Sequence, residues 1–299
     1  MDQIILSAIT EGVLWSTVSI GLYITFKILN IADMTTEGSF PLGAAISVIM
    51  ILKGASPVVA LIVSFFGGIL AGGITGFLMT KLKIPSLLSG ILTMSALYSI
   101  NLKVMGKPNI NILNGRTIIK DLTPYQVLRP LAVLLIGLTV VYIVLVFLYY
   151  FFKTEFGQAL IAAGDNPQMA LSQGINVENM RIFGVMLANG VIALGGGVIA
   201  QKNGFSDVNM GIGVIVVALA SIIIGDVLFP YVTFGARLVC IIMGSIIYRL
   251  LLAFIIYLDL IPADDFKMFS AVIIALCLAL PTIQEKLHIN VKGEKNNVK

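Results

Sequence analysis

The chain has 299 residues, of which 58% are hydrophobic and 11% are charged, and its formal net charge is +4. Soluble domains average about 25% charged residues, so this composition, with a mean hydropathy of +1.02, excludes an ordinary soluble globule. Apolar runs near the roughly 20 residues that cross a bilayer recur along the whole length, and they are continuous rather than alternating, which excludes a β-barrel. We therefore expect an all-α polytopic membrane protein.

Nine candidate membrane spans follow one another along the chain. They cover roughly residues 12–29, 38–52, 58–80, 85–102, 130–152, 182–200, 211–228, 233–257 and 267–284. The second span is short, begins with SFPLG and ends at Lys53, which is compatible with a broken or re-entrant helix buried among its neighbours. We therefore expect eight or nine crossings.

Glycine clusters within two of these spans. Gly68, Gly72 and Gly76 follow GxxxG spacing, with Gly67 and Gly73 beside them, and Gly195–Gly197 are consecutive. Because glycine has no Cβ atom, such faces let helix backbones approach closely in lipid. We interpret both clusters as packing surfaces.

The loop at 103–129 is basic. It holds Lys103, Lys107, Arg116, Lys120 and Arg129 against Asp121 alone. If residues 153–181 face the cytoplasm, this loop lies outside, and the chain places ten Lys/Arg inside against eight outside. The positive-inside rule therefore does not decide the orientation.

Residues 155–176, EFGQALIAAGDNPQMALSQGIN, interrupt the apolar pattern with two predicted short helices. Ala159–Ala163 favour the first helix, and Gly164 is expected to end it. Asn166 suits the N-cap of the second helix, Pro167 its first position, and Gly174 the position just past its end. By local features alone, the segment can equally be an ordinary connection between spans.

The wider pattern favours a specific role. The run G-x-A-L-x-A-A-G-x-N-x-x-x-A-x-x-x-G-I-N, from Gly157 to Asn176, resembles the coupling segment of bacterial ABC import permeases. The most similar group contains the ribose and branched-chain amino-acid permeases, in a branch associated with tryptophan and other aromatic amino acids. The stretches 30–45, NIADMTTEGSFPLGAA, 204–226 and 261–281 resemble the same family.

This resemblance implies that residues 1–285 form a single transmembrane permease domain and that residues 286–299 form a cytoplasmic basic tail. It implies that the coupling segment faces the cytoplasm and sits in a cleft on a separate ATP-binding subunit. The residues that match the motif or complete its second helix are Gly157, Ala159, Ala163, Gly164, Asn166, Pro167, Gln168, Met169, Ala170 and Gly174.

The resemblance also implies the partners of the chain. They are a second copy of the chain, two ATP-binding subunits that carry ATP and magnesium, an extracytoplasmic solute-binding lipoprotein, membrane lipid and a small solute, in the cytoplasmic membrane of a bacterium. Binding proteins of such importers dock through carboxylates, so Lys107, Arg116 and Lys120 are candidate docking residues. The tail is expected beside anionic lipid, and we expect no nucleic-acid partner.

Five polar or aromatic residues within the spans are candidates for a solute pathway: Trp15, Ser19, Asn101, Asn189 and Arg249. For each, a structural hydrogen bond between helices is the commoner role, and Arg249 can also extend toward the membrane surface. Asp226 is expected to pair near the cytoplasmic face, whereas Asp33 and Glu37 are interpreted as loop residues.

An enzyme is disfavoured. The single histidine, His288, lies in the tail, so the spans hold no Ser–His pair and no HExxH metal site. The chain also has no GxxxxGK[ST] phosphate loop, so ATP would be bound by another polypeptide, and we expect neither cofactor nor metal here. An ion-coupled secondary transporter is the main alternative, and a membrane scaffold subunit is the third.

Overall fold

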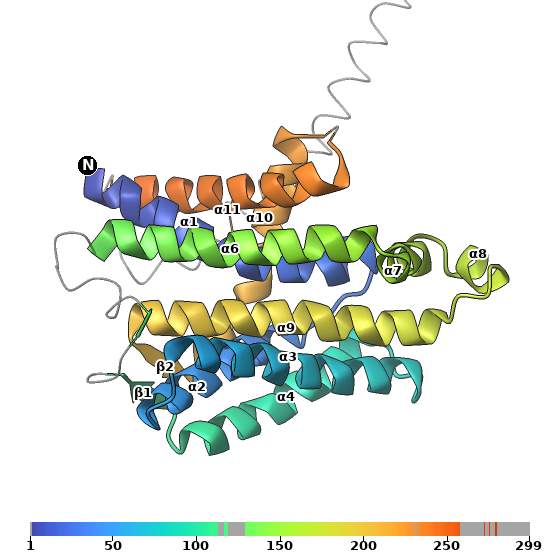
Figure 1. Cartoon of the computed structure of the whole chain (residues 1–299), viewed down its shortest axis with the longest axis horizontal. Helices are drawn as coiled ribbons and strands as arrows, with labels where there is room; N and C mark the ends of the chain where they lie inside the picture. Colours follow the sequence, from blue (N-terminus) through green and yellow to red (C-terminus); the bar gives the residue numbers. More distant parts are fainter. Residues whose placement is uncertain are drawn as a thin grey trace, which may run out of the picture.

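The computed structural model describes residues 2–112, 117–118, 129–230 and 232–257, and the isolated positions 272, 275 and 279. Long helices dominate these residues (Figure 1). In chain order the elements are α1 (Asp2–Tyr23), the π-helix η1 (Ile24–Ile28), α2 (Thr36–Leu52), α3 (Pro57–Thr80), α4 (Ser86–Met105), β1 (Asn109–Asn111), α6 (Arg129–Lys153), α7 (Glu155–Asp165), α8 (Pro167–Ser172), α9 (Val177–Asn203), β2 (Phe205–Asp207), the 3-10 helix η3 (Val208–Gly211), α10 (Val214–Leu228) and α11 (Phe234–Tyr257).

Seven helices of the described part are long and apolar enough to cross a membrane, and α2 is a shorter apolar helix. They correspond to the first eight expected spans, whereas the ninth, 267–284, lies almost wholly outside the described residues. The first span begins ten residues earlier than expected, at Asp2. Its polar residue Glu11 is held by Lys202 of α9 and by the indole N–H of Trp15, so the helix continues through it.

The shortness of α2 has a structural cause. The chain between Ile28 and Thr36 is largely not helical, yet it lies inside the bundle: the hydroxyls of Thr35 and Thr75 are 2.7 Å apart. Thr75 is five residues from the end of α3, about 7.5 Å along the helix axis. Irregular backbone at that depth requires burial by neighbouring helices, and α3 and α9 contact this segment through Thr75 and Asn189.

Helix α9 is the centre of the bundle. In Figure 1 it runs between α2, α3 and α4 on one side and α1, α6 and α11 on the other. The three glycines Gly195, Gly196 and Gly197 each face a different neighbour, namely Val18 of α1, Phe40 of α2 and Leu61 of α3. Three helices can therefore approach α9 at one level, which confirms the packing role of this cluster.

The GxxxG glycines of α3 face α9 as well. A Cβ atom on Gly68, Gly72 or Gly76 would collide with the backbone of α9 at Asn189, Val185 or Ile182. Gly73, next in sequence to Gly72, meets only the side chain of Met186, at 3.5 Å or more. The face of α3 that carries Gly68, Gly72 and Gly76 is therefore the one in close contact with the backbone of α9.

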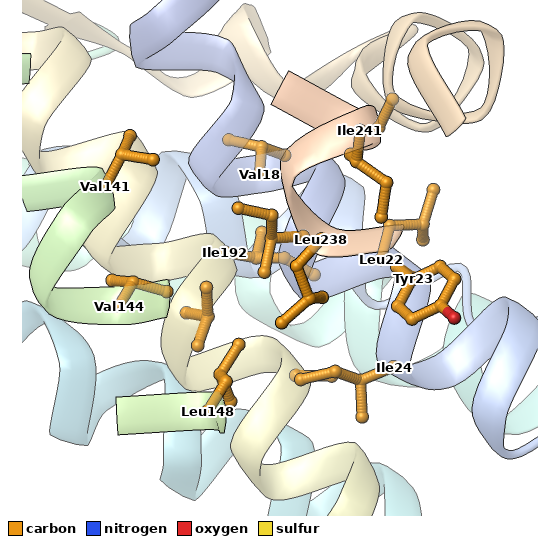
Figure 2. Packing of buried hydrophobic residues seen from close by; sticks show 14 of the residues in the cluster. Val18, Leu22, Tyr23, Ile24, Val141, Val144, Leu148, Ile192, Leu238 and Ile241 are labelled. Carbon is orange, nitrogen blue, oxygen red and sulfur yellow. The ribbon is translucent and has the colours of Figure 1, made fainter. Parts of the chain in front are cut away.

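The main hydrophobic core lies largely between α9 and the helices α1, α6 and α11. Figure 2 shows Val18 and Leu22 of α1, Val141 and Leu148 of α6, and Ile192 of α9 packed together with residues of α11. Cys240 of α11 is a free cysteine and is buried. The two short strands β1 and β2 pair antiparallel at the end of the bundle opposite α8 (Figure 1), with Ile110 opposite Ser206.

Candidate coupling segment and solute cavity

Helix α7 begins at a side-chain cap and packs closely on its surroundings. The hydroxyl of Thr154 accepts a hydrogen bond from the N–H of Gly157, 3.2 Å away. The helix does not end at Gly164, as the sequence predicts, but continues to Asp165. Gly164 is buried there, and only glycine fits, because a Cβ atom would collide with the carbonyl oxygen of Ile28.

Helix α8 has the ends that its sequence predicts. Asn166 is the N-cap, since its Oδ1 accepts a hydrogen bond from the N–H of Met169 at 3.1 Å, and Pro167 is the first helical residue. At the other end Gly174 has a φ of 82°, and its N–H donates to the carbonyl of Leu171 at 3.0 Å. Both termini of this six-residue helix are therefore hydrogen-bonded locally.

One face of α8 is buried in this chain and the other is exposed. Ala170 packs with Ala163 of α7 and Val177 of α9. Met169 is 57% exposed and Leu171 is 60% exposed. The α8 face, as we call the exposed residues Gln168, Met169, Leu171 and Ser172, therefore presents two large apolar side chains outside the bundle.

The ten candidate coupling residues divide accordingly. Buried within this chain are Gly157, Ala163, Gly164 and Ala170, and partly buried are Ala159 and Pro167. Exposed are Asn166, Gln168, Met169 and Gly174. Leu171 completes the exposed apolar surface, and sequence reasoning omitted it because its exposure depends on how α8 packs on α7 and α9.

A direct contact connects α7 to the end of the first span. Gly164 lies against the backbone of Ile28 in η1, and the side-chain amide of Asn30 donates to the carbonyl of Gly164 at 3.3 Å. In η1 the N–H of Leu29 donates to the carbonyl of Ile24, five residues earlier, which is the π-helical pattern. Such π-turns occur frequently at functional sites.

The segment after η1 ends in a buried polar cluster, which we call the Asp33 cluster. The backbone N–H of Thr35 donates to Asp33 Oδ1 at 2.9 Å, and the amide of Asn189 donates to Asp33 Oδ2 at 2.7 Å. Asn189 Oδ1 in turn accepts from the hydroxyl of Ser39 at 2.7 Å.

The sequence placed both acidic residues of this region in a loop. Asp33 does lie in the irregular segment before α2, where it is buried, whereas Glu37 lies in the first turn of α2. Glu37 Oε1 accepts a hydrogen bond from the N–H of Gly213 at 3.0 Å, just before α10. Their spacing of four residues across the start of an apolar helix, among Thr35, Thr36 and Ser39, was the available signal of this placement.

Glu37 also lines a cavity of about 390 Å³ between α2, α4 and η3. We call it the Glu37 cavity, and its other polar lining residues are Ser95, Tyr98, Asn101 and Asn209. The amide N–H of Asn101 donates to the carbonyl of Gly38 at 3.2 Å. Its Oδ1 is buried and has no hydrogen-bond partner among the residues that the structure describes.

The five candidate pathway residues do not share one site. Asn189 belongs to the Asp33 cluster, and the buried hydroxyl of Ser19 donates to the carbonyl of Trp15. Arg249 lies over the ring of Trp15, with its Cζ atom 4.4 Å from the ring centroid, a cation–π arrangement. Asn101 is the member of this set that lines the Glu37 cavity.

The charged residues near the two ends of the bundle have clear positions. Asp226 pairs with Lys27 at 2.9 Å and with Arg237 at 2.7 Å, as its expected pairing role requires. Lys107 is exposed between α4 and β1, at the end opposite α8 (Figure 1). The other two candidate docking residues, Arg116 and Lys120, lie outside the described residues.

Comparisons with known proteins agree with a transport role. Residues 4–279 match the family described as branched-chain amino acid transport system / permease component. The chain is 40% identical over 296 residues to the tyrosine transport system permease protein of Clostridioides difficile (strain R20291), covering 99% of this chain and 95% of that protein. It is 30% identical over 195 residues to the autoinducer 2 import system permease protein LsrC of Salmonella paratyphi B, covering 65% and 55%.

The fold is also similar to a solved structure, PsaBC from Streptococcus pneumoniae in complex with Fab. The TM-score is 0.51 at 15% identity, covering 92% of this chain and 90% of that chain. With seven helices that can cross a bilayer in its described part, the protein is a multi-pass protein of the cytoplasmic membrane. It belongs to the branched-chain amino acid transport system permease family.

Proposed function

We propose that this chain is the membrane subunit of an ABC importer that moves an aromatic amino acid, with a separate ATPase docked on the α8 face. The solute class rests on the relative described as a tyrosine transport permease, at 40% identity over nearly the whole chain. The sequence resemblance also favours an aromatic solute and includes tryptophan in that class.

The observation that carries the ATPase contact is the exposure of Met169 and Leu171 on a short helix whose two ends are capped. Exposed apolar side chains on a protruding element are typical of a protein-binding surface. Ala170, on the opposite face, holds α8 against the chain. We therefore infer that α8 can move together with the ATPase while it stays helical and packed on this chain.

The contacts between α7, η1 and the central helix can pass a movement of α8 on to the membrane helices. Helix α7 touches η1 through Gly164 and Ile28, and Asn30 binds the carbonyl of Gly164. Three residues further along, Asp33 binds Asn189 of the central helix. In our proposal, closure of two ATP-binding subunits moves α8 and α7, and these contacts pass the movement to α2 and α9.

We infer the remaining parts of the proposed importer from the resemblance to the family. ATP and magnesium are held by the partner ATPase, two copies of this chain form a homodimer with the pathway between them, and a lipoprotein receptor delivers the solute. The receptor docks at the end opposite α8, where Lys107 is exposed, with Arg116 and Lys120 as further contacts.

The test is a double substitution on the α8 face. Met169→Asp with Leu171→Asp places two charges on the proposed contact, and we expect ATP-driven uptake to fall at least tenfold because the apolar contact is lost. The control is Met169→Leu with Leu171→Met, which keeps the apolar surface and should keep uptake. Unchanged uptake in the charged variant, with the ATPase still bound, would contradict the proposal.

Ala170 is a poorer position for this test. A charge there would be buried against Ala163 and Val177 and would disturb the packing of α8 on α7 and α9. Loss of uptake in Ala170→Asp would therefore not separate a lost contact from a damaged segment.

An ion-coupled secondary transporter is the second candidate, and one observation favours it: the carboxylate of Glu37 lies at a cavity beside membrane helices. The two candidates differ in their energy source. We expect uptake into proteoliposomes only when the ATPase and ATP are present. Uptake driven by an ion gradient in the absence of the ATPase would favour the secondary transporter instead.

A further inference from the structure

The Glu37 cavity contains several polar groups that the protein itself does not use. Asn101 is fully buried, yet its Oδ1 has no partner among the described residues. Glu37 uses Oε1 to bind the N–H of Gly213, and within the same described part of the chain no residue donates to its Oε2. A buried acceptor without a donor costs about 1–3 kcal/mol, so the Oδ1 of Asn101 indicates a missing partner, and the partly exposed carboxylate of Glu37 has an oxygen available to a ligand.

The two acceptors belong to one wall of the cavity. The amide of Asn101 is bonded to the carbonyl of Gly38, the residue that follows Glu37. This bond fixes which amide atom is the donor and leaves Oδ1 free to accept. A carboxylate and an amide oxygen from residues that line one cavity are suited to a group that carries several N–H donors and a positive charge.

The rest of the lining is suited to an aromatic amino acid. Tyr98 is half exposed at the cavity, and Met94, Pro41 and Ile212 supply apolar surface around it. The hydroxyl of Tyr98 and the side-chain amide of Asn209 are donors that no described residue engages, so a carboxylate can bind there. The volume of about 390 Å³ falls in the range of about 300–1,000 Å³ typical of small-molecule sites.

The cavity also has a defined level in the bundle. Asn101 lies four residues before the end of α4 and Ser95 ten residues before it, or about 6 and 15 Å along the helix axis. That end of α4 leads to β1, opposite α8. The cavity therefore occupies the half of the bundle that a solute delivered at the β1–β2 end would enter first.

We propose that the Glu37 cavity binds the transported aromatic amino acid, with Glu37 and Asn101 accepting hydrogen bonds from its α-ammonium group and Tyr98 contacting its ring. This proposal rests on the proposed function and names residues that contact the solute. A divalent metal ion fits the cavity less well, because the described residues contain no group of three His, Cys, Asp or Glu side chains that could hold one.

The test measures protection of a thiol in the cavity by the solute. Ser95→Cys, made with Cys240→Ala and Cys277→Ala, places one thiol at the cavity, and the matched control Thr139→Cys places one on the exposed face of α6. The purified permease–ATPase complex, without receptor, is labelled with a maleimide. We expect saturating L-tyrosine to slow labelling at least fivefold in the first protein and to leave the control unchanged.

Two analogues test the assignment of the ammonium group. Tyramine keeps the ammonium and lacks the carboxylate, whereas 3-(4-hydroxyphenyl)propionate lacks the ammonium. We expect tyramine to protect the thiol in part and the propionate to protect it at least tenfold more weakly than tyrosine.

Glu37→Gln then separates binding from folding. Glutamine keeps an oxygen for the N–H of Gly213, so the start of α10 should stay intact and the melting temperature should change little. We expect protection to require at least tenfold more tyrosine and the preference for tyrosine over the propionate to shrink. Glu178→Gln, a surface change at the α8 end of the bundle, should alter neither the tyrosine concentration needed for protection nor the preference for tyrosine over the propionate.

The outcomes distinguish this proposal from the proposed function. If the complex imports tyrosine with ATP but tyrosine does not protect the thiol, or if Glu37→Gln keeps full protection, the cavity proposal is wrong and the transport function stands. If tyrosine protects the thiol but ATP drives no uptake, the cavity proposal stands and the importer function is wrong.

Discussion

Helices α9 and α4 both carry asparagine within membrane spans, but the two side chains differ in how many hydrogen-bond partners they have. In α9, 78% of the membrane window is buried, and Asn189 is bonded to Asp33, Ser39 and the carbonyl of Val185. In α4 only 28% of the window is buried, and Asn101 keeps a buried oxygen unpaired beside a cavity. A buried polar group with all its partners stabilises the fold, whereas the unpaired oxygen of Asn101 is, in our proposal, an acceptor for the solute.

The largest expected effect comes from Asn189→Leu. The substitution removes the donor to Asp33 Oδ2 and the acceptor for the hydroxyl of Ser39, which keeps only a 3.4 Å bond to the carbonyl of Thr36, and we expect a loss of about 3 kcal/mol in stability. Thermal unfolding in detergent would measure it. The control is Asn179→Leu, at an exposed position of the same helix, which should change stability little. Equal effects at the two positions would contradict the structural role of Asn189.

A smaller effect is expected from the glycine contact between α3 and α9. Gly72→Ala drives a Cβ atom into the backbone of α9 at Val185 and should cost about 1–3 kcal/mol. The neighbouring change, Gly73→Ala, meets only the flexible side chain of Met186, so we expect it to be neutral or slightly stabilising. Comparing the two melting temperatures tests whether α9 is held by one face of α3, and a reversed order would show that it is not.

Asn101→Ala should have the smallest effect on stability. It removes one hydrogen bond to Gly38, worth about 1 kcal/mol, and also removes the unpaired oxygen. We nevertheless expect a clear rise in the KM for tyrosine uptake, because the solute loses an acceptor. If stability fell as far as in Asn189→Leu while the KM stayed constant, the contrast between the two helices would not hold.

The membrane spans and the caps of α8 were predictable because both depend on neighbours in the sequence. Hydropathy located the first eight spans, and Asn166, Pro167 and Gly174 set the ends of α8 through local bonds. The early start of α1 was missed because Glu11 breaks the apolar run, and only Lys202, 191 residues away, explains how a helix tolerates it.

The faces of the elements could not be predicted in the same way. Ala170 and Met169 are adjacent in sequence, and their opposite exposure depends on where α7 and α9 lie. The Glu37 cavity needs η3, more than 160 residues further along the chain, to return beside α2 and α4. No local pattern in the sequence indicates that η3 packs beside α2 and α4.

The enclosure of α9 by three neighbours at Gly195–Gly197 has a practical consequence for following the transport cycle. A helix fixed on three sides is the natural reference frame for spectroscopic distance measurements. Spin-label pairs that join an exposed position near either terminus of α9 to the tip of α8 or to α4 would report displacement of those elements relative to α9 and the helices packed on it.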